Sequence, residues 1–137
     1  DSIKASSSTS NSILVTVEEI NERSRRSRNI IAYSVPESKS AHTNNRISHD
    51  SDLAAAIIEY CQTDRSKCLK TVRLGKVKPG VIRPLQIQME SETDVINILK
   101  HYSNESFTFQ NPTLADVKLS RDRTVREREL LVELRQE

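Results

Sequence analysis

The chain has 137 residues, of which 35% are hydrophobic and 29% are charged, and its formal net charge is +2. This length is enough for one domain with a single core. No apolar run approaches the ~20 residues that a bilayer-spanning helix requires, so we expect no membrane partner. Cys61 and Cys68 are separated by six residues and the three histidines are scattered. That spacing does not suit a zinc site, so we expect reduced cysteines and neither metal nor cofactor.

The N-terminal part of the sequence predicts a linker followed by a helix. Residues 1–12 are rich in serine and predict a flexible linker. Over residues 13–28 the a/d rhythm of a coiled coil is carried by Ile13, Val17, Ile20 and Ser24. A single amphipathic helix lying on the domain fits this rhythm equally well. The chain begins with Asp and ends within a helical pattern, so we expect a piece of a longer protein.

From residue 29 onward the periodicity predicts short alternating elements. A β-branched run before Pro36 indicates a buried strand, and an Asp/Ser cap at Asp50 indicates the start of a helix. Ser91 with Asp94 three residues later predicts the cap of a second helix. In order, the predicted elements are a strand in 29–36, a helix in 50–61, strands near 71–74 and 85–89, a helix in 91–102, a strand in 116–120 and a charged helix in 121–137.

The order βαββαβ predicts an α+β, ferredoxin-like (split βαβ) domain over residues 29–120. RNA-recognition motifs with this order stack bases on aromatic side chains of the first and third strands, which lie at the centre of the sheet. The alternation places four residues on the open face, and Arg73 on the same side; the four are Ile31, Tyr33, Gln86 and Gln88. Only Tyr33 offers a ring for stacking, because Phe107 and Phe109 are assigned to the core or a loop. Binding is therefore predicted to depend on phosphate contacts, with weak sequence preference and strong salt dependence.

The small net charge hides a strong segregation of charge. Seven basic residues and no acid occur between Arg65 and Met89, and four basic residues and no acid occur between Arg23 and Pro36. These stretches carry +11, so the remainder carries −9. Local cation density and counterion release determine the affinity for a polyanion, so this pattern favours a phosphate-binding surface. A solvated strand face and a basic loop are the alternative interpretation.

The sequence does not carry the patterns of a catalytic site, and we expect no enzyme. Neither cysteine has a histidine close in sequence, and Asp50 and Asp52 occupy positions expected for a helix cap. Two glycines in the whole chain cannot supply a glycine-rich phosphate loop.

Four segments together resemble the protein encoded by the first open reading frame of LINE-type non-LTR retrotransposons. They are "INERSRRSRNIIAYSVPES", "VRLGK", "RPLQIQMESETDVINIL" and "LSRDRTVREREL", and the resemblance covers residues 17–137. It implies a trimeric coiled coil, an RNA-recognition-like domain and a further small C-terminal domain. It also implies binding of single-stranded RNA or DNA, chaperone activity on nucleic acids, and a place in cytoplasmic ribonucleoprotein particles, with the nucleus as a second location. The full-length protein would form its trimer through the coiled coil upstream.

The resemblance also assigns residues. The segment Val35 to Glu37 matches the end of the first strand, Arg73 is the arginine of "RLGK", Arg83 precedes the third strand, and Arg128 matches an arginine early in the last helix that contacts nucleic acid. We predict a phosphate track that crosses the sheet between its second and third strands and leaves toward Arg128. The nucleic-acid-binding candidates are Arg73, Lys76, Lys78, Arg83, Arg128, Tyr33, Gln86, Gln88, Arg25, Arg26, Arg28 and Arg121. The alternative is a protein-interaction or self-assembly module of a domesticated element that uses the same open face.

Overall fold

The computed structural model describes residues 16–104 and 108–136. The chain forms two compact units. One, the sheet unit, is Arg28–Asp122, and the other, the helical unit, combines Asp1–Ser27 with Arg123–Glu137. The predicted linker over 1–12, the coiled-coil position Ile13 and Phe107 lie outside the described residues.

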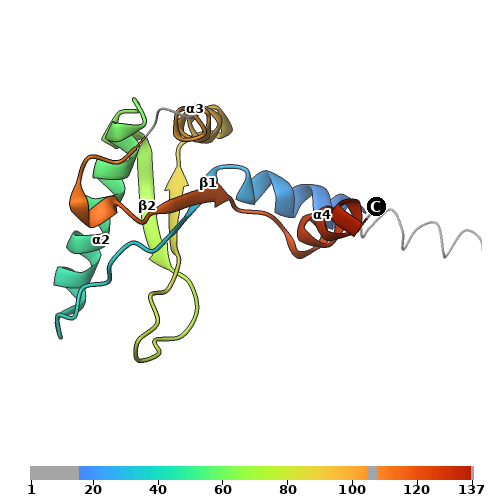
Figure 1. Ribbon diagram of the computed structural model, residues 1–137. Coiled ribbons are helices and arrows are strands. Elements are labelled where there is room, and N and C mark those ends of the chain that lie inside the picture. The colour runs from blue at the N-terminus through green and yellow to red at the C-terminus, as the bar shows by residue number, and fades with distance from the viewer. Residues whose placement is uncertain (1–15, 105–107, 137) are drawn as a thin grey trace, which may run out of the picture. The chain divides into compact units, whose positions relative to one another are not determined.

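The sheet unit is built on a four-stranded antiparallel sheet with the order β2-β3-β1-β4. The strands are β1 (Asn29–Tyr33), β2 (Cys68–Arg73), β3 (Leu85–Met89) and β4 (Lys118–Arg121). The first and third strands are therefore central, as predicted, and β2 and β4 form the edges. Together with the helices this is an α+β arrangement compatible with a ferredoxin-like fold (Figure 1).

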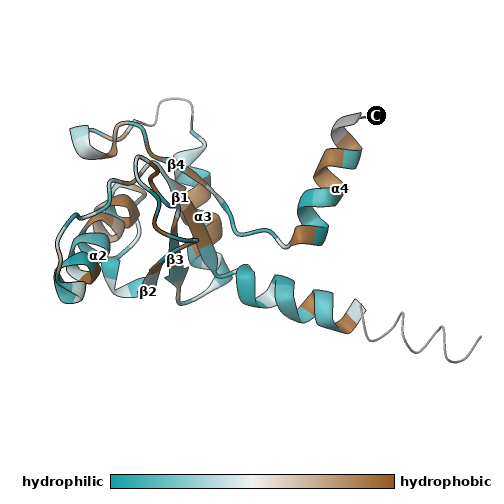
Figure 2. Ribbon diagram, turned by 90° about the horizontal axis from the view of Figure 1, so that it is seen from below, coloured by the Kyte–Doolittle hydropathy of each residue, from teal (hydrophilic) through white to brown (hydrophobic). Residues whose placement is uncertain are grey.

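Two helices supply the other half of the core, α2 (Thr43–Tyr60) and α3 (Glu92–Tyr102). Apolar residues of both pack against one face of the sheet, and the cluster includes Ile57, Ile58, Val95 and Ile98 from the helices and Ile30, Ala32, Leu85, Ile87 and Leu119 from the strands. Figure 2 shows this apolar material in brown on the strands and on parts of the two helices. Short 3-10 helices precede β2 (Arg65–Lys67) and β4 (Pro112–Leu114). We call the sheet surface opposite α2 and α3 the open face.

The cap and the buried face of α3 agree with the sequence. Ser91 is its N-cap and accepts a hydrogen bond from the Asp94 backbone N–H at 3.3 Å. Val95 and Ile98 are fully buried, and Leu99 and Tyr102 pack at the edge of the core. Of the two phenylalanines, Phe109 also packs against the core, which agrees with the prediction.

The predicted start of α2 is wrong. The helix begins at Thr43 rather than at Asp50, and its first two turns are the segment read as a polar loop. Those turns bury no side chain, and Ile47 is their only large apolar residue, so they carry no apolar periodicity. Asp50 consequently lies within the helix and does not cap it.

The helical unit contains a helix over residues 16–26 and α4 (Val125–Gln136). Thr124 and Glu127 form a capping box at the start of α4, in which each donates a backbone N–H to the other's side chain, at 3.2 and 3.1 Å. The Thr124 hydroxyl also donates to Glu19 at 2.6 Å, so the two helices are joined there. This bond, followed by one from Arg23, lowers the pKa of Glu19.

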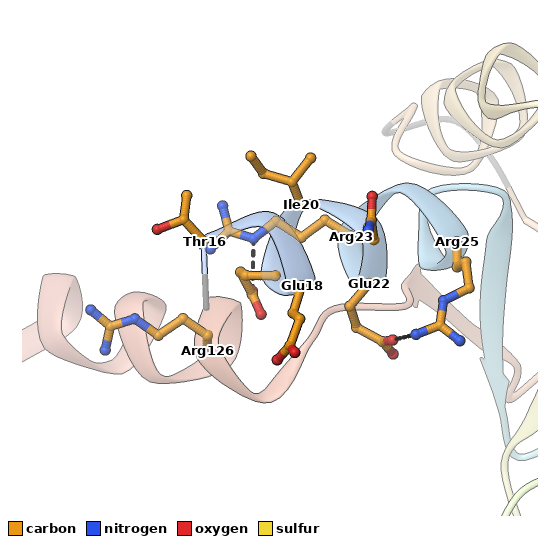
Figure 3. Close-up of a pocket in the computed structure, with 9 residues that line it drawn as sticks. Thr16, Glu18, Ile20, Glu22, Arg23, Arg25 and Arg126 are labelled. Atoms are coloured by element: carbon orange, nitrogen blue, oxygen red, sulfur yellow. Dashed lines mark hydrogen bonds and ion pairs between the residues drawn. The ribbon is translucent and has the colours of Figure 1, made fainter. Parts of the chain in front are cut away.

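The helix over 16–26 is hydrophilic over most of its length (Figure 2). Its predicted coiled-coil positions within the described residues are exposed. Val17 is 47% exposed and Ile20 is 59% exposed. Figure 3 shows Ile20 on the opposite side of this helix from Glu18 and Glu22. Among the described helices, none combines the length and apolar character that a membrane span needs.

Candidate nucleic-acid interface

Arg73 lies on the helix side of the sheet, which corrects its predicted position on the open face. Its register partner on β3 is Leu85, a fully buried core residue, whereas Val72 pairs with Gln86. Directly paired residues project from the same face of a sheet, so Val72 belongs to the open face and Arg73 does not. The predicted alternation along this strand was therefore out of phase by one residue, which exchanges the two faces.

The Arg73 guanidinium is fully engaged within the protein. It donates to Asp50 of α2 at 2.8 and 3.2 Å, and to the carbonyl oxygens of Val35, Pro36 and Arg83 at 2.7, 2.9 and 2.9 Å. Arginine has five N–H donors, so none remains for a phosphate. The side chain is 6% exposed. Arg73 therefore ties the segment after β1, α2 and the β3 entry together.

Arg83 forms a second ion pair in the same region. Its Nη2 and Nε donate to Glu37 Oε1 at 2.7 and 2.9 Å, and its backbone N–H donates to Oε2 at 3.0 Å. Burial alone would raise the pKa of Glu37, but these hydrogen bonds and the charges of Arg83 and Arg73 outweigh it and lower the pKa. Glu37 thus neutralises Arg83, and the expectation of a charge without an acidic partner is wrong for both arginines.

The basic stretch between Arg65 and Met89 is largely neutralised through space. Four of its seven cations form ion pairs; these are Arg65 with Glu59, Lys67 with Glu90, Arg73 with Asp50 and Arg83 with Glu37. The remaining three, Lys70, Lys76 and Lys78, form no ion pair with any residue that the structure describes. Within this stretch, positive charge that no described acid neutralises is therefore confined to these three lysines.

Tyr33 and Lys118 are paired at one end of the open face. They are register partners on β1 and β4, and Tyr33 is 43% exposed. Lys118 is exposed and has no ion-pair partner within the described residues. Ile31 also belongs to this face, since it pairs with Gln86 and Ser120, but it is 5% exposed and so is closed to a ligand. The accessible part of this end is an aromatic ring beside an ammonium group.

The hairpin loop 74–84 brings further cations to the same end of the sheet. It joins Arg73 to Leu85, and Leu85 pairs with Ala32, next to Tyr33. Figure 1 shows this loop extending beyond the sheet. Lys76 and Lys78 are exposed on it, and Lys39 is exposed on the segment between β1 and α2. We call Lys39, Lys76, Lys78 and Lys118, together with Tyr33, the cationic end.

An apolar groove lies between the hairpin loop and the segment 36–40. Its volume is about 840 Å³, and Val77, Val81 and Ile82 line it. Val77 is 77% exposed, the highest exposure of a large apolar side chain in the described residues. The cations Lys39, Arg46 and Lys78 border the same groove.

Gln86 and Gln88 lie on the open face as predicted, but they belong to a hydrogen-bonded network. Asp122 Oδ2 accepts from Asn29 Nδ2 at 3.0 Å and from Gln86 Nε2 at 3.1 Å. Gln86 Oε1 in turn accepts from Gln88 Nε2 at 2.9 Å. The network joins β1, β3 and the residue that follows β4, at the end of the face away from Tyr33.

The remaining predicted arginines fall into two groups. Arg25 pairs with Glu22 (Figure 3). Arg26 also pairs with Glu22 and donates to the Arg123 carbonyl at 2.9 Å. The acids that neutralise the arginines of this helix precede them by one turn, outside the acid-free stretch that begins at Arg23. The second group, Arg28, Arg121 and Arg128, is exposed, with Arg128 on α4 in the helical unit.

Sequence analysis missed four open-face residues: Lys70, Lys118, Asn29 and Asp122. The alternation of Lys118 with the buried Leu119 is a signal for one of them. The network around Asp122 has no such signal, because it depends on the register of three strands.

The described residues contain no group of three histidine, cysteine or acidic side chains able to hold a metal ion. Both cysteines are free thiols. Burial raises the pKa of Cys61 to about 11 and also raises the pKa of Cys68.

No protein-family model matches the chain, and no curated protein matches it at a significant level.

Proposed function

We propose that this chain is a binding module for single-stranded RNA or DNA and not an enzyme, and that it belongs to the ribonucleoprotein of a LINE-type element. The observation that carries the proposal is the pairing of exposed Tyr33 with Lys118 on the open face. An aromatic ring stacks on any base, and an adjacent ammonium group binds the phosphate that follows.

The cationic end supports this proposal by its charge. Its four lysines form no ion pair with the described residues, whereas Arg73 and Arg83 nearby are neutralised by Asp50 and Glu37. A single strand lying over Tyr33 would meet Lys118 on one side and the hairpin lysines on the other. Affinity would then fall steeply with salt, because each phosphate contact releases counterions.

The strand order supports the ferredoxin-like, RNA-recognition-like part of the proposal. The order β2-β3-β1-β4 with both long helices on one face leaves the opposite face of β1 and β3 for a ligand. This face differs from a typical RNA-recognition motif, because two amides stand where aromatic rings are usual. We therefore place phosphate contacts above stacking in their contribution to affinity.

The wider roles in this proposal rest on the sequence resemblance. A longer protein would trimerise through the upstream coiled coil, act as a nucleic-acid chaperone and enter ribonucleoprotein particles. The exposure of Val17 and Ile20 is compatible with a helix that continues a coiled-coil seam.

The apolar groove favours a second candidate function, the docking of a protein partner. Its valine and isoleucine walls and its bordering cations match an extended segment that carries apolar and acidic side chains. Glu37 does not oppose such a partner, because Arg83 already neutralises it.

The test is a competition between nucleic acids of equal length. A labelled single-stranded RNA is bound to the chain at several salt concentrations and displaced with unlabelled single strands or duplex DNA. We expect single strands to compete better, since no described element is patterned to enter a major groove, and we expect a steep salt dependence. Equal competition by duplex, or affinity independent of salt, would reject this function and favour the protein partner.

A further inference from the structure

The amide network on the open face has a fixed orientation. An ionised carboxylate accepts hydrogen bonds and donates none. The amides of Asn29 and Gln86 must therefore turn their NH₂ groups, and not their oxygens, toward Asp122. This removes the usual ambiguity between the oxygen and nitrogen of a side-chain amide. Gln86 Oε1 then faces Gln88 and receives its NH₂ group.

Two amide oxygens are left over by this arrangement. Asn29 Oδ1 and Gln88 Oε1 have no hydrogen-bond partner among the described residues. No partnerless polar side-chain atom is buried in the described part of the chain, so both oxygens reach the surface. Asn29 and Gln88 are register partners on β1 and β3, and their side chains therefore stand next to each other on the open face.

We propose that Asn29 and Gln88 form a nucleobase subsite that prefers bases carrying an exocyclic amino group. Two outward acceptors match the amino donors of cytosine, adenine and guanine, whereas uracil presents a carbonyl oxygen at the position of the cytosine amino group. Uracil offers a single N3–H donor flanked by two carbonyl oxygens, so it can satisfy at most one of the two acceptors and sets a carbonyl oxygen against the other, which disfavours it. The inference rests on the single-strand binding proposed above and adds a base preference to it.

The neighbouring charge is suited to the same subsite. Lys70 of β2 is the register partner of Gln88, so it projects from the open face beside the subsite. It is exposed and makes no ion pair with the described residues. Lys70 can therefore hold the phosphate of the nucleotide whose base contacts Gln88.

The experiment compares RNA oligomers of cytidine and of uridine, each roughly ten nucleotides long, at neutral pH and one salt concentration. The two pyrimidines have the same ring size, so the comparison isolates the amino group. We expect the cytidine oligomer to bind about fivefold more tightly, at the lower end of the discrimination that a well-placed base contact gives. Equal affinities would overturn the subsite and leave the proposed function standing. Failure of both oligomers to bind would overturn both.

Asp122→Asn tests the orientation of the amides. An asparagine at this position donates as well as accepts, so the amides are free to turn. The cytidine and uridine oligomers should then bind with about equal affinity. Asp116→Asn is the matched control, because it removes the same charge at an exposed position in the turn before β4; it should retain the preference. A preference that survives Asp122→Asn overturns the proposal.

If Asp122→Asn melts at a lower temperature than the parent, Gln88→Leu provides a second test of the subsite. It removes the outward oxygen and leaves Asp122 bonded to Asn29 and Gln86. The preference for cytidine should again be lost, and its retention would contradict the subsite.

Discussion

Arg73 and Asp50 form a two-point ion pair on the helix side of the sheet, with Nη2–Oδ1 at 2.8 Å and Nε–Oδ2 at 3.2 Å. The arginine that the sequence placed on a ligand-binding surface is thus part of the structural framework. Its three carbonyl contacts hold the segment after β1 against the entry of β3.

Arg73→Ala should destabilise the fold by about 3 kcal/mol, because it leaves Asp50 and three carbonyl groups without their donor in a largely buried site. Urea unfolding measures the change. Arg121→Ala is the matched control, since Arg121 is exposed on the same sheet, and its stability should change by less than about 0.5 kcal/mol. Equal stability of the two variants would contradict the structural role of Arg73.

The contrast between α3 and Arg73 shows what the sequence can reveal. The cap at Ser91 and the apolar face of α3 are local patterns, and both predict the structure correctly. Arg73 is different, because the alternation of Val72 and Leu74 suggests that these apolar residues point inward. Arg73 points inward instead, because Asp50, twenty-three positions away in sequence, pairs with its buried guanidinium. Asp50 itself was read as a cap, because the first turns of α2 carry a single large apolar residue, Ile47.

The residues of the candidate site also divide into those with a local sequence signal and those that depend on contacts distant in sequence. Lys76 and Lys78 lie beside Pro79 and Gly80, a local turn signal in the sequence, and both are exposed. Lys118 and the Asp122 network depend on strand register, and the ion pairs of Arg25, Arg26 and Arg83 depend on helix or tertiary neighbours. Charge counted along the chain does not predict which cations remain unpaired.

Glu37→Gln should make the stability of the fold less dependent on pH in the acid range. The pKa of Glu37 is lowered in the folded protein, so its ionised form stabilises the fold at pH values above its ordinary value of 4.5. This contribution is lost as the pH falls from 4.5 through the lowered pKa. Thermal melts between neutral and acid pH should show the parent losing its advantage over Glu37→Gln in that range. An advantage that is constant with pH would contradict the ion pair with Arg83.

Gln62→Gly should stabilise the protein by about 0.5–1 kcal/mol. Gln62 follows α2 with a φ of +65°, and it donates its backbone N–H to Glu59 while Thr63 donates to Ile58, the pattern of a Schellman motif. Glycine adopts this conformation without strain. Gln110→Gly is the control, because Gln110 has no positive φ, and it should not stabilise. Chemical denaturation measures the free energy of unfolding of both variants. A loss of stability in Gln62→Gly would contradict the strain at this position.

Tyr33→Ala should weaken binding of single-stranded RNA by roughly tenfold, within the ~1–3 kcal/mol of one stacked base. Its salt dependence should stay that of the parent, because no phosphate contact is removed. Tyr33→Phe keeps the ring and should bind like the parent. If the phenylalanine variant loses as much affinity as the alanine variant, the ring does not act by stacking.

The salt dependence of RNA binding by the combined variant Lys76→Ala, Lys78→Ala and Lys118→Ala tests the cationic end most directly. Three lost phosphate contacts should lower the slope of log affinity against log salt by about 2, at ~0.7 per contact for a single strand. Lys100→Ala is the control, since Lys100 is exposed on α3, and its slope should equal that of the parent. A combined variant that melts like the parent and keeps the parental slope would contradict the proposed interface.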